Sequence, residues 1–90
     1  MTVRRTVDIC NAKGLHARAS AKFVKTAAAF DAEVTVSRDD TSVDARSIMG
    51  LMMLAAGIGC CIEISAEGPE AEQALEALVA LVEDRFGEEQ

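Results

Sequence analysis

The chain passes from a loop into a helix within one short stretch, Gly14-Leu15-His16-Ala17-Arg18-Ala19-Ser20. Glycine permits a tight turn, and the alanine-rich run 17–29 that follows is typical of a helix. The only histidine lies at the start of that helix. Unpaired N–H groups and partial positive charge at a helix start favour a bound anion such as phosphate and disfavour an imidazolium. We therefore predict that the imidazole of His16 is neutral and nucleophilic. Arg18 is placed to bind the negative charge of a phosphoryl group that the imidazole accepts.

Outward from this stretch, the pattern of apolar residues predicts four strands and three helices. Val34 and Val36 alternate with Glu33 and Thr35, as in a strand with one wet face. Similar patterns predict strands at 2–9, 32–37, 41–45 and 60–67 and helices at 17–29, 48–54 and 69–86. The order βαββαβα predicts an α+β fold, a mainly antiparallel sheet covered by helices, in one domain spanning residues 1–90.

Three local signals set the expected limits of the second and third helices. Ser47 is a good N-cap for the helix at 48–54, which we expect to end through 55–57. Pro69 suits the first turn of the last helix. The apolar positions of that helix continue to Phe86, and Gly87 is expected to end it.

The charge is negative overall but unevenly distributed. The net charge is −6, yet residues 1–46 hold eight of the nine basic residues and only six of the fifteen acidic ones. An acidic chain without a basic or aromatic stripe is a poor candidate for binding nucleic acid. A cluster near His16 could still steer acidic protein partners, although its members are equally compatible with ordinary solvated helix residues: Lys13, Arg18, Lys22 and Lys25.

Composition also argues against a membrane protein. The segment after Met1 is not an apolar leader, and the longest apolar run, 48–58, is about half of the roughly 20 residues that a spanning helix needs. We therefore expect a soluble, cytoplasmic protein. Trp and Tyr are absent and only three Phe occur, so the core is expected to be aliphatic.

The three cysteines are Cys10, Cys60 and Cys61. They lack CxxC spacing, and only one histidine could join them, so we expect no metal site, no cofactor and no disulfide framework. Small buried thiols are the expected role, and a cysteine-based redox enzyme is the disfavoured alternative. The predicted fold brings Cys10 towards Cys60 and Cys61.

Two separate motifs resemble those of one family. Gly-Leu-His-Ala-Arg at 14–18 resembles the active-site motif of HPr, the histidine-containing phosphocarrier of the phosphoenolpyruvate-dependent phosphotransferase system. Ser-Ile-Met-Gly-Leu-Met at 47–52 looks like the family's regulatory serine and the helix after it. The resemblance covers essentially all 90 residues, and it implies an open-faced sandwich with a four-stranded antiparallel sheet covered on one face by three helices.

The resemblance also implies a role for the histidine stretch. His16 would accept a phosphoryl group from enzyme I and pass it to an enzyme IIA-type protein, and Arg18 would stabilise the group in transfer. Such a carrier is not itself a catalyst. The family commonly has proline after this arginine, whereas this chain has Ala19; since a helix start accepts either residue, we expect function to be retained.

The second motif implies regulation and docking. Ser47 matches the serine that HPr kinase/phosphorylase modifies in organisms that possess that enzyme, although a plain N-cap serine is the alternative. Leu51 and Leu54 are expected to face the core. The expected partner-binding residues are Ala17, Lys22, Lys25, Ile48, Met49 and Met52, and the alternative for the methionines is a place in the core.

Two questions stay open at this point. A phosphorylation-dependent regulatory interaction module with little or no relay role is the alternative to a carrier. Within the family, Ala19 and the methionine-rich helix favour the nitrogen-related branch over the sugar-uptake branch. No motif indicates a stable oligomer, so a monomer is expected.

Overall fold

The computed structural model describes residues 2–89; Met1 and Gln90, the two ends of the predicted domain, lie outside the described residues. The elements follow in the order β1 (Thr2–Asp8), α1 (Ala17–Ala28), β2 (Glu33–Arg38), β3 (Thr41–Asp44), α2 (Ile48–Met53), β4 (Cys61–Glu67), α3 (Ala71–Glu83) and the short 3₁₀ turn η1 (Arg85–Gly87). The predicted order βαββαβα is confirmed.

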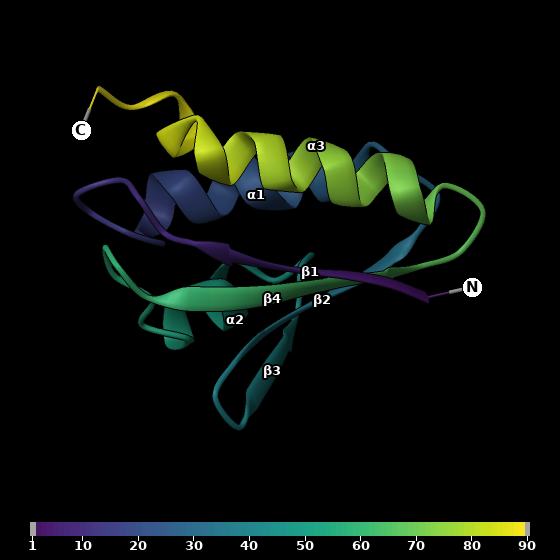
Figure 1. Cartoon of the computed structure of the whole chain (residues 1–90), viewed down its shortest axis with the longest axis horizontal. Helices are drawn as coiled ribbons and strands as arrows, with labels where there is room; N and C mark the ends of the chain where they lie inside the picture. The colour runs from purple at the N-terminus through teal and green to yellow at the C-terminus, as the bar shows by residue number, and fades with distance from the viewer. Residues whose placement is uncertain (1, 90) are drawn as a thin grey trace.

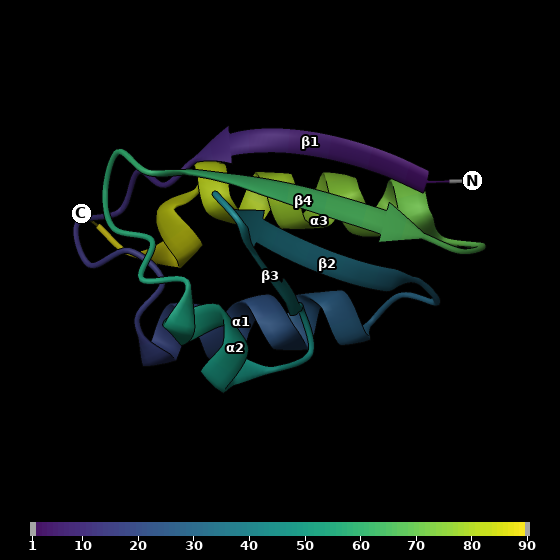
Figure 2. The same ribbon diagram turned by 90° about the horizontal axis from the view of Figure 1, so that it is seen from below.

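The four strands form one antiparallel sheet in the order β1-β4-β2-β3 (Figure 2). Because β4 pairs on both sides, Ile62 lies opposite Val7 of β1 and Ile64 lies opposite Val36 of β2. All four of these side chains are buried, whereas Thr35 of β2 is exposed. The alternation in sequence thus gives one face of the sheet to the core.

The helices supply the second layer. α1 and α3 lie side by side on one face of the sheet, and α2 packs against α1 near the β3 edge (Figure 1). The core between the layers is mainly aliphatic, as predicted, and its largest fully buried apolar side chains are Phe23, Phe86, Ile9, Leu51, Ile62, Ile64, Leu78, Val36 and Val82. The predicted α+β sandwich is confirmed.

The end of α3 differs from the prediction. The helix was expected to run from 69 to 86, but it begins at Ala71 and ends at Glu83. Arg85, Phe86 and Gly87 follow with φ of 54°, 55° and 78°, in the left-handed region. Phe86 is nevertheless fully buried. The prediction that Phe86 is buried is confirmed, but the prediction that it lies in the helix is wrong. The chain turns after α3 and brings the Phe86 side chain into the core.

The end of α2 also differs in detail. The helix ends at Met53, and the left-handed residue after it is Ala55, with φ of 52°, instead of a glycine. Arg38 Nη1 donates to the carbonyl oxygens of Leu54, at 2.8 Å, and Ala55, at 3.1 Å. A guanidinium from β2 therefore satisfies carbonyl groups that the helix end leaves unpaired. Within residues 2–89, no helix combines the length and the apolar character needed to cross a membrane.

Candidate functional site

The loop before α1 is held against the segment that follows α2. Gly14 has φ of 62°, and a Cβ built on it would lie 2.3 Å from the carbonyl oxygen of Ala56. The next residue, Leu15, donates its N–H to that same oxygen at 3.0 Å. Only glycine fits such a close backbone approach in a left-handed conformation. This contact sets where the following residue, His16, begins the helix.

His16 is the N-cap residue of α1. Its backbone is extended, its side chain makes no capping hydrogen bond, and its carbonyl accepts the N–H of Ser20 at 2.9 Å. The imidazole is therefore free to point away from the helix axis. Residues 17–19 lie in the first turn, where N–H groups lack partners inside the helix, so the positive end of α1 lies beside the imidazole.

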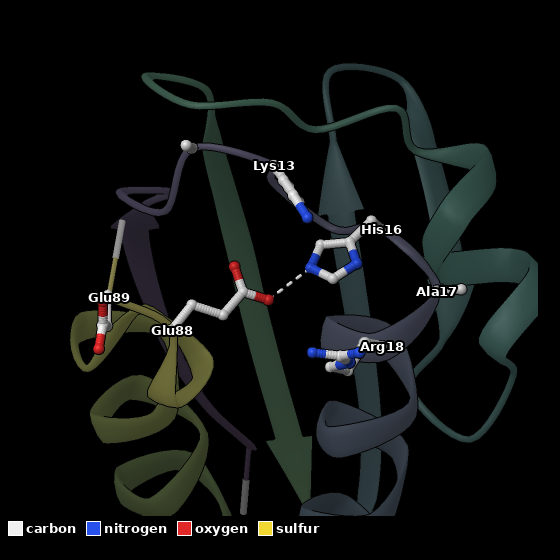
Figure 3. Close-up of a pocket in the computed structure, with 7 residues that line it drawn as sticks. Lys13, His16, Ala17, Arg18, Glu88 and Glu89 are labelled. Carbon is white, nitrogen blue, oxygen red and sulfur yellow. Dashed lines mark hydrogen bonds and ion pairs between the residues drawn. The ribbon is translucent and has the colours of Figure 1, made fainter.

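The imidazole lines an open pocket of about 460 Å³. Figure 3 shows the side chains of Lys13 and Arg18 around the ring. The lining residues are Ala12, Lys13, His16, Ala17, Arg18, Glu88 and Glu89. Two cations and a helix start thus surround a partly exposed imidazole, an environment that suits an anionic group attached to the ring.

Glu88, from the C-terminal tail, binds the ring. Its Oε2 lies 2.5 Å from Nε2 of His16, and its Oε1 accepts a hydrogen bond of 3.0 Å from Nδ2 of Asn11. These bonds from Asn11 and His16, with the nearby positive charge of Lys13, hold the pKa of Glu88 below its usual range despite partial burial. An ionised carboxylate only accepts hydrogen bonds, so Nε2 carries the hydrogen. In the neutral form of the imidazole, which has one N–H, Nδ1 then has the free lone pair.

Asn11 connects this carboxylate to the loop. Its amide is fully buried, and Nδ2 donates both to Glu88 and to the carbonyl oxygen of Gly14, at 2.9 Å. Both N–H groups are used, while Oδ1 has no partner among the described residues. The amide therefore joins the histidine loop to the C-terminal tail.

The predicted basic cluster is only partly brought together. Lys13 and Arg18 line the pocket with His16. Lys22 instead donates from Nζ to the carbonyl oxygen of Phe86 at 2.6 Å and so holds the C-terminal turn. Lys25 lies in the last turn of α1, away from the pocket.

The second predicted region has the expected local geometry. Ser47 caps α2, since its Oγ accepts the N–H of Gly50 at 2.9 Å. Leu51 and Leu54 are buried. Among the described residues, the large apolar side chains that remain exposed are Ile48, Met49, Met52 and Met53 of α2 and Ile58 in the loop after it. We call the four residues on α2 the apolar patch. Ala17 and this patch lie on neighbouring elements, because α2 packs against α1.

The three cysteines are free, but the expectation of buried thiols is wrong: Cys10 and Cys60 are half-buried and Cys61 is exposed, because they lie at and beside the ends of β1 and β4 and not in the core. The backbone N–H of Ile9 donates to the carbonyl oxygen of Cys60 at 2.8 Å, so Cys10 directly follows the residue paired with Cys60. Cys61 donates from Sγ to Oδ1 of Asp8, and this hydrogen bond is the main reason that the pKa of Cys61 is raised. A raised pKa leaves less of the reactive thiolate, which further disfavours the redox alternative.

Sequence reasoning missed several residues of these regions, and Ala12 and Glu89 at the pocket are among them. Glu88 and Asn11 were not predicted because their contacts join parts of the chain far apart in sequence. Met53 adds to the apolar patch on α2 beyond the expected residues. The buried Asn11 offered one signal, since a polar side chain directly after a strand and before a glycine turn often supports a loop.

Comparison with known proteins agrees with this geometry. Residues 3–84 match the family model described as the PTS HPr component phosphorylation site. The phosphocarrier protein HPr of Cupriavidus necator is 50% identical over 86 residues, which cover 96% of this chain and 97% of that protein. The phosphocarrier protein NPr of Shewanella violacea is 43% identical over 86 residues, covering 96% of this chain and 94% of that protein.

The fold gives the same result. The crystal structure of HPr-C-His from Thermoanaerobacter tengcongensis superposes with a TM-score of 0.93 at 45% identity, covering 98% of this chain and 99% of that chain. Relatives named HPr and NPr both match along nearly the whole chain, so the nitrogen-related branch stays a prediction. The chain belongs to the HPr family of phosphocarrier proteins of the phosphotransferase system.

Proposed function

We propose that this chain accepts a phosphoryl group on Nδ1 of His16 from enzyme I and passes it to an enzyme IIA-type protein, in the cytoplasm and as a monomer. The observation that carries the proposal is the position of the imidazole. It lies at the start of α1 in a pocket shared with Lys13 and Arg18, and Glu88 occupies the other ring nitrogen. Phosphoryl transfer depends mainly on positioning and charge stabilisation, and the partners supply the remaining catalytic groups.

Arg18 has a defined part in this proposal. A phosphoryl group on His16 brings about two negative charges into the pocket, and a guanidinium binds such oxygens through paired hydrogen bonds. Lys13 adds a second positive charge at the same pocket. The N–H groups of the first turn of α1 complete a set of donors for the attached group.

The direct test is incubation of the purified chain with phosphoenolpyruvate, Mg²⁺ and enzyme I, followed by intact mass measurement before and after acid treatment. We expect a gain of one phosphoryl group that acid removes, since phosphohistidine is acid-labile. Addition of an enzyme IIA-type protein should remove the group and label the acceptor. A folded sample that gains nothing from several enzymes I would contradict the relay and favour the regulatory interaction module.

The apolar patch is the proposed docking surface for these partners. Met49 is 73% exposed and Met52 43% exposed, so a charge introduced at either position disturbs a binding surface more than the core. Flexible methionine side chains adapt to several partner shapes, which suits a carrier that binds and releases different proteins.

The substitution Met49→Glu should weaken binding to enzyme I about tenfold, the effect of losing one well-packed interface residue. Its free energy of unfolding should change by no more than about 0.5 kcal/mol, as for other surface substitutions. Titration calorimetry and urea unfolding measure the two quantities. Thr35→Glu adds the same charge on the exposed face of the sheet and should leave binding unchanged; a large loss of stability in Met49→Glu would instead make this residue part of the core.

Ser47 is the proposed regulatory site. Its hydroxyl lies at the start of α2, next to the patch residues Ile48 and Met49. A phosphate at this position would add about two negative charges at the edge of the patch and would oppose binding of acidic partners. Inhibition would then need no change of fold.

The variant Ser47→Ala should lose about 1 kcal/mol of stability, because the N–H of Gly50 loses its cap. It should also gain no phosphate from HPr kinase/phosphorylase and ATP, whereas the parent gains one. Thermal unfolding and intact mass measure these outcomes, with Ser42→Ala on β3 as the control. Equal phosphorylation of Ser47→Ala and the parent would refute the regulatory role.

A further inference from the structure

The C-terminal tail is built to deliver one carboxylate to the imidazole. After α3, Arg85 and Phe86 adopt a left-handed conformation that is unfavourable for residues other than glycine. The buried Phe86 ring and the hydrogen bond from Lys22 Nζ to the Phe86 carbonyl hold this turn in place. The N–H of Glu88 then donates to the carbonyl of Arg85 at 2.9 Å. The burial of Phe86 and its hydrogen bond from Lys22 therefore stabilise an unfavourable turn, and this turn places Glu88 beside the imidazole.

The carboxylate is held on both oxygens. Oε1 accepts from Asn11 and Oε2 accepts from His16, and the side chains of His16 and Glu88 are only 27% and 17% exposed. Glu89 lines the same pocket but makes no hydrogen bond to the ring within the described part of the chain. Figure 3 shows the two neighbouring glutamates pointing in different directions. The contact is thus specific to Glu88.

We propose that Glu88 is a positioning residue for phosphoryl transfer, which keeps the proton of His16 on Nε2 in both the acceptance and the release step. This inference rests on the proposed phosphocarrier function. A carboxylate that fixes the tautomer and orientation of a histidine through the nitrogen that does not react is a recurring device in enzymes and metal sites.

The proton on Nε2 of His16 matters both when the phosphoryl group is accepted and when it is released. On acceptance, the Nδ1 lone pair forms the P–N bond while the bond from phosphorus to the donor breaks with its electrons left on the donor. The ring, which keeps its Nε2–H, becomes positive, and the carboxylate stabilises that charge. On release, a nucleophile of the acceptor protein bonds to phosphorus while the P–N electrons return to Nδ1, and the departing group is a neutral imidazole. Without the Nε2 proton, the departing group would be an imidazolate, a far poorer leaving group.

His16 is the only histidine, so its ring nitrogens can be followed by ¹⁵N NMR without overlap. Spectra of the unphosphorylated protein at a pH where the ring is neutral report which nitrogen carries the hydrogen. The parent should show the Nε2–H form. Glu88→Ala should increase the Nδ1–H form several-fold, and Glu88→Gln, whose amide oxygen can still accept, should lie between them. The control Glu89→Gln should match the parent.

Transfer rates give the second measurement. Glu88→Ala should slow both acceptance from enzyme I and release to the acceptor by about tenfold, the usual scale for losing a carboxylate that supports a histidine. Thermal unfolding checks that the turn is intact. An unchanged tautomer pattern in Glu88→Ala, or faster transfer, would overturn the proposal. A parent that takes no phosphoryl group would refute the proposed function, while the NMR comparison would still decide whether Glu88 positions the ring.

Discussion

The variant His16→Ala is expected to fold normally and to gain no phosphoryl group from phosphoenolpyruvate and enzyme I. The imidazole makes no helix-capping hydrogen bond, and 27% of the side chain is exposed, so its loss removes the hydrogen bond to Glu88 but few packing contacts. We expect the free energy of unfolding to change by about 1 kcal/mol or less, the range for a position outside the core. We expect the transfer reaction, in contrast, to be abolished, because the proposed nucleophile is removed.

Intact mass measurement after incubation decides this prediction. Thr35→Ala is the control, because it removes an exposed side chain from the sheet, outside the pocket and the apolar patch, and should be phosphorylated like the parent. A folded His16→Ala variant that still gains an acid-labile phosphoryl group would place the acceptor elsewhere in the chain.

The substitution Gly14→Ala is expected to have the largest effect on stability. The new Cβ would lie 2.3 Å from the Ala56 carbonyl oxygen and 2.7 Å from the Gly57 Cα, so the backbone must move. Because Gly14 also has a left-handed backbone conformation, we expect the free energy of unfolding to fall by about 2–4 kcal/mol. Because the displaced loop carries His16, phosphoryl acceptance should fall even where the variant stays folded.

Two other glycines separate the two causes of this expected loss of stability, the steric contact of the new Cβ and the left-handed backbone conformation. A Cβ on Gly59 would meet nothing within 4 Å, but its φ is 86°, so Gly59→Ala should lose only the conformational part, about 1–2 kcal/mol. Gly57 has neither a close neighbour nor positive φ, and Gly57→Ala should be nearly neutral. Urea unfolding gives the free energy of unfolding of each of the three variants and so ranks their stability. A Gly14→Ala variant no less stable than Gly59→Ala would show that the contact with Ala56 is not tight.

Local patterns were sufficient for most of the fold. The alternation around Val34 and Val36 identified β2 and the face that it buries, and the N-cap Ser47 marked the start of α2 correctly. These signals act between residues that are close in sequence, where the backbone period and hydrogen-bonding geometry leave few alternatives. For the same reason, the sequence predicted that His16 begins a helix.

Longer-range contacts explain what could not be predicted. The spacing of Phe86 continues the apolar stripe of α3, and a helical period alone gave no sign of the left-handed turn that buries it. Lys22 has the sequence context of an exposed helix residue, and only the returning tail provides the carbonyl that it binds. Ala55 takes a left-handed conformation without being glycine, and Arg38, distant in sequence, binds the carbonyl oxygens of Leu54 and Ala55.

The residues of the candidate site also fall into two groups, those that the sequence predicted and those that only the tertiary structure revealed. The sequence by itself determined the α+β class, the strand pattern, and a histidine at a helix start with Arg18 two residues later. Only the tertiary structure decided that Glu88, 72 residues after His16, occupies Nε2 and that Asn11 holds the same carboxylate. Propensity and capping depend on neighbours along the chain, whereas the meeting of tail and loop depends on how α1 and α3 pack on the sheet.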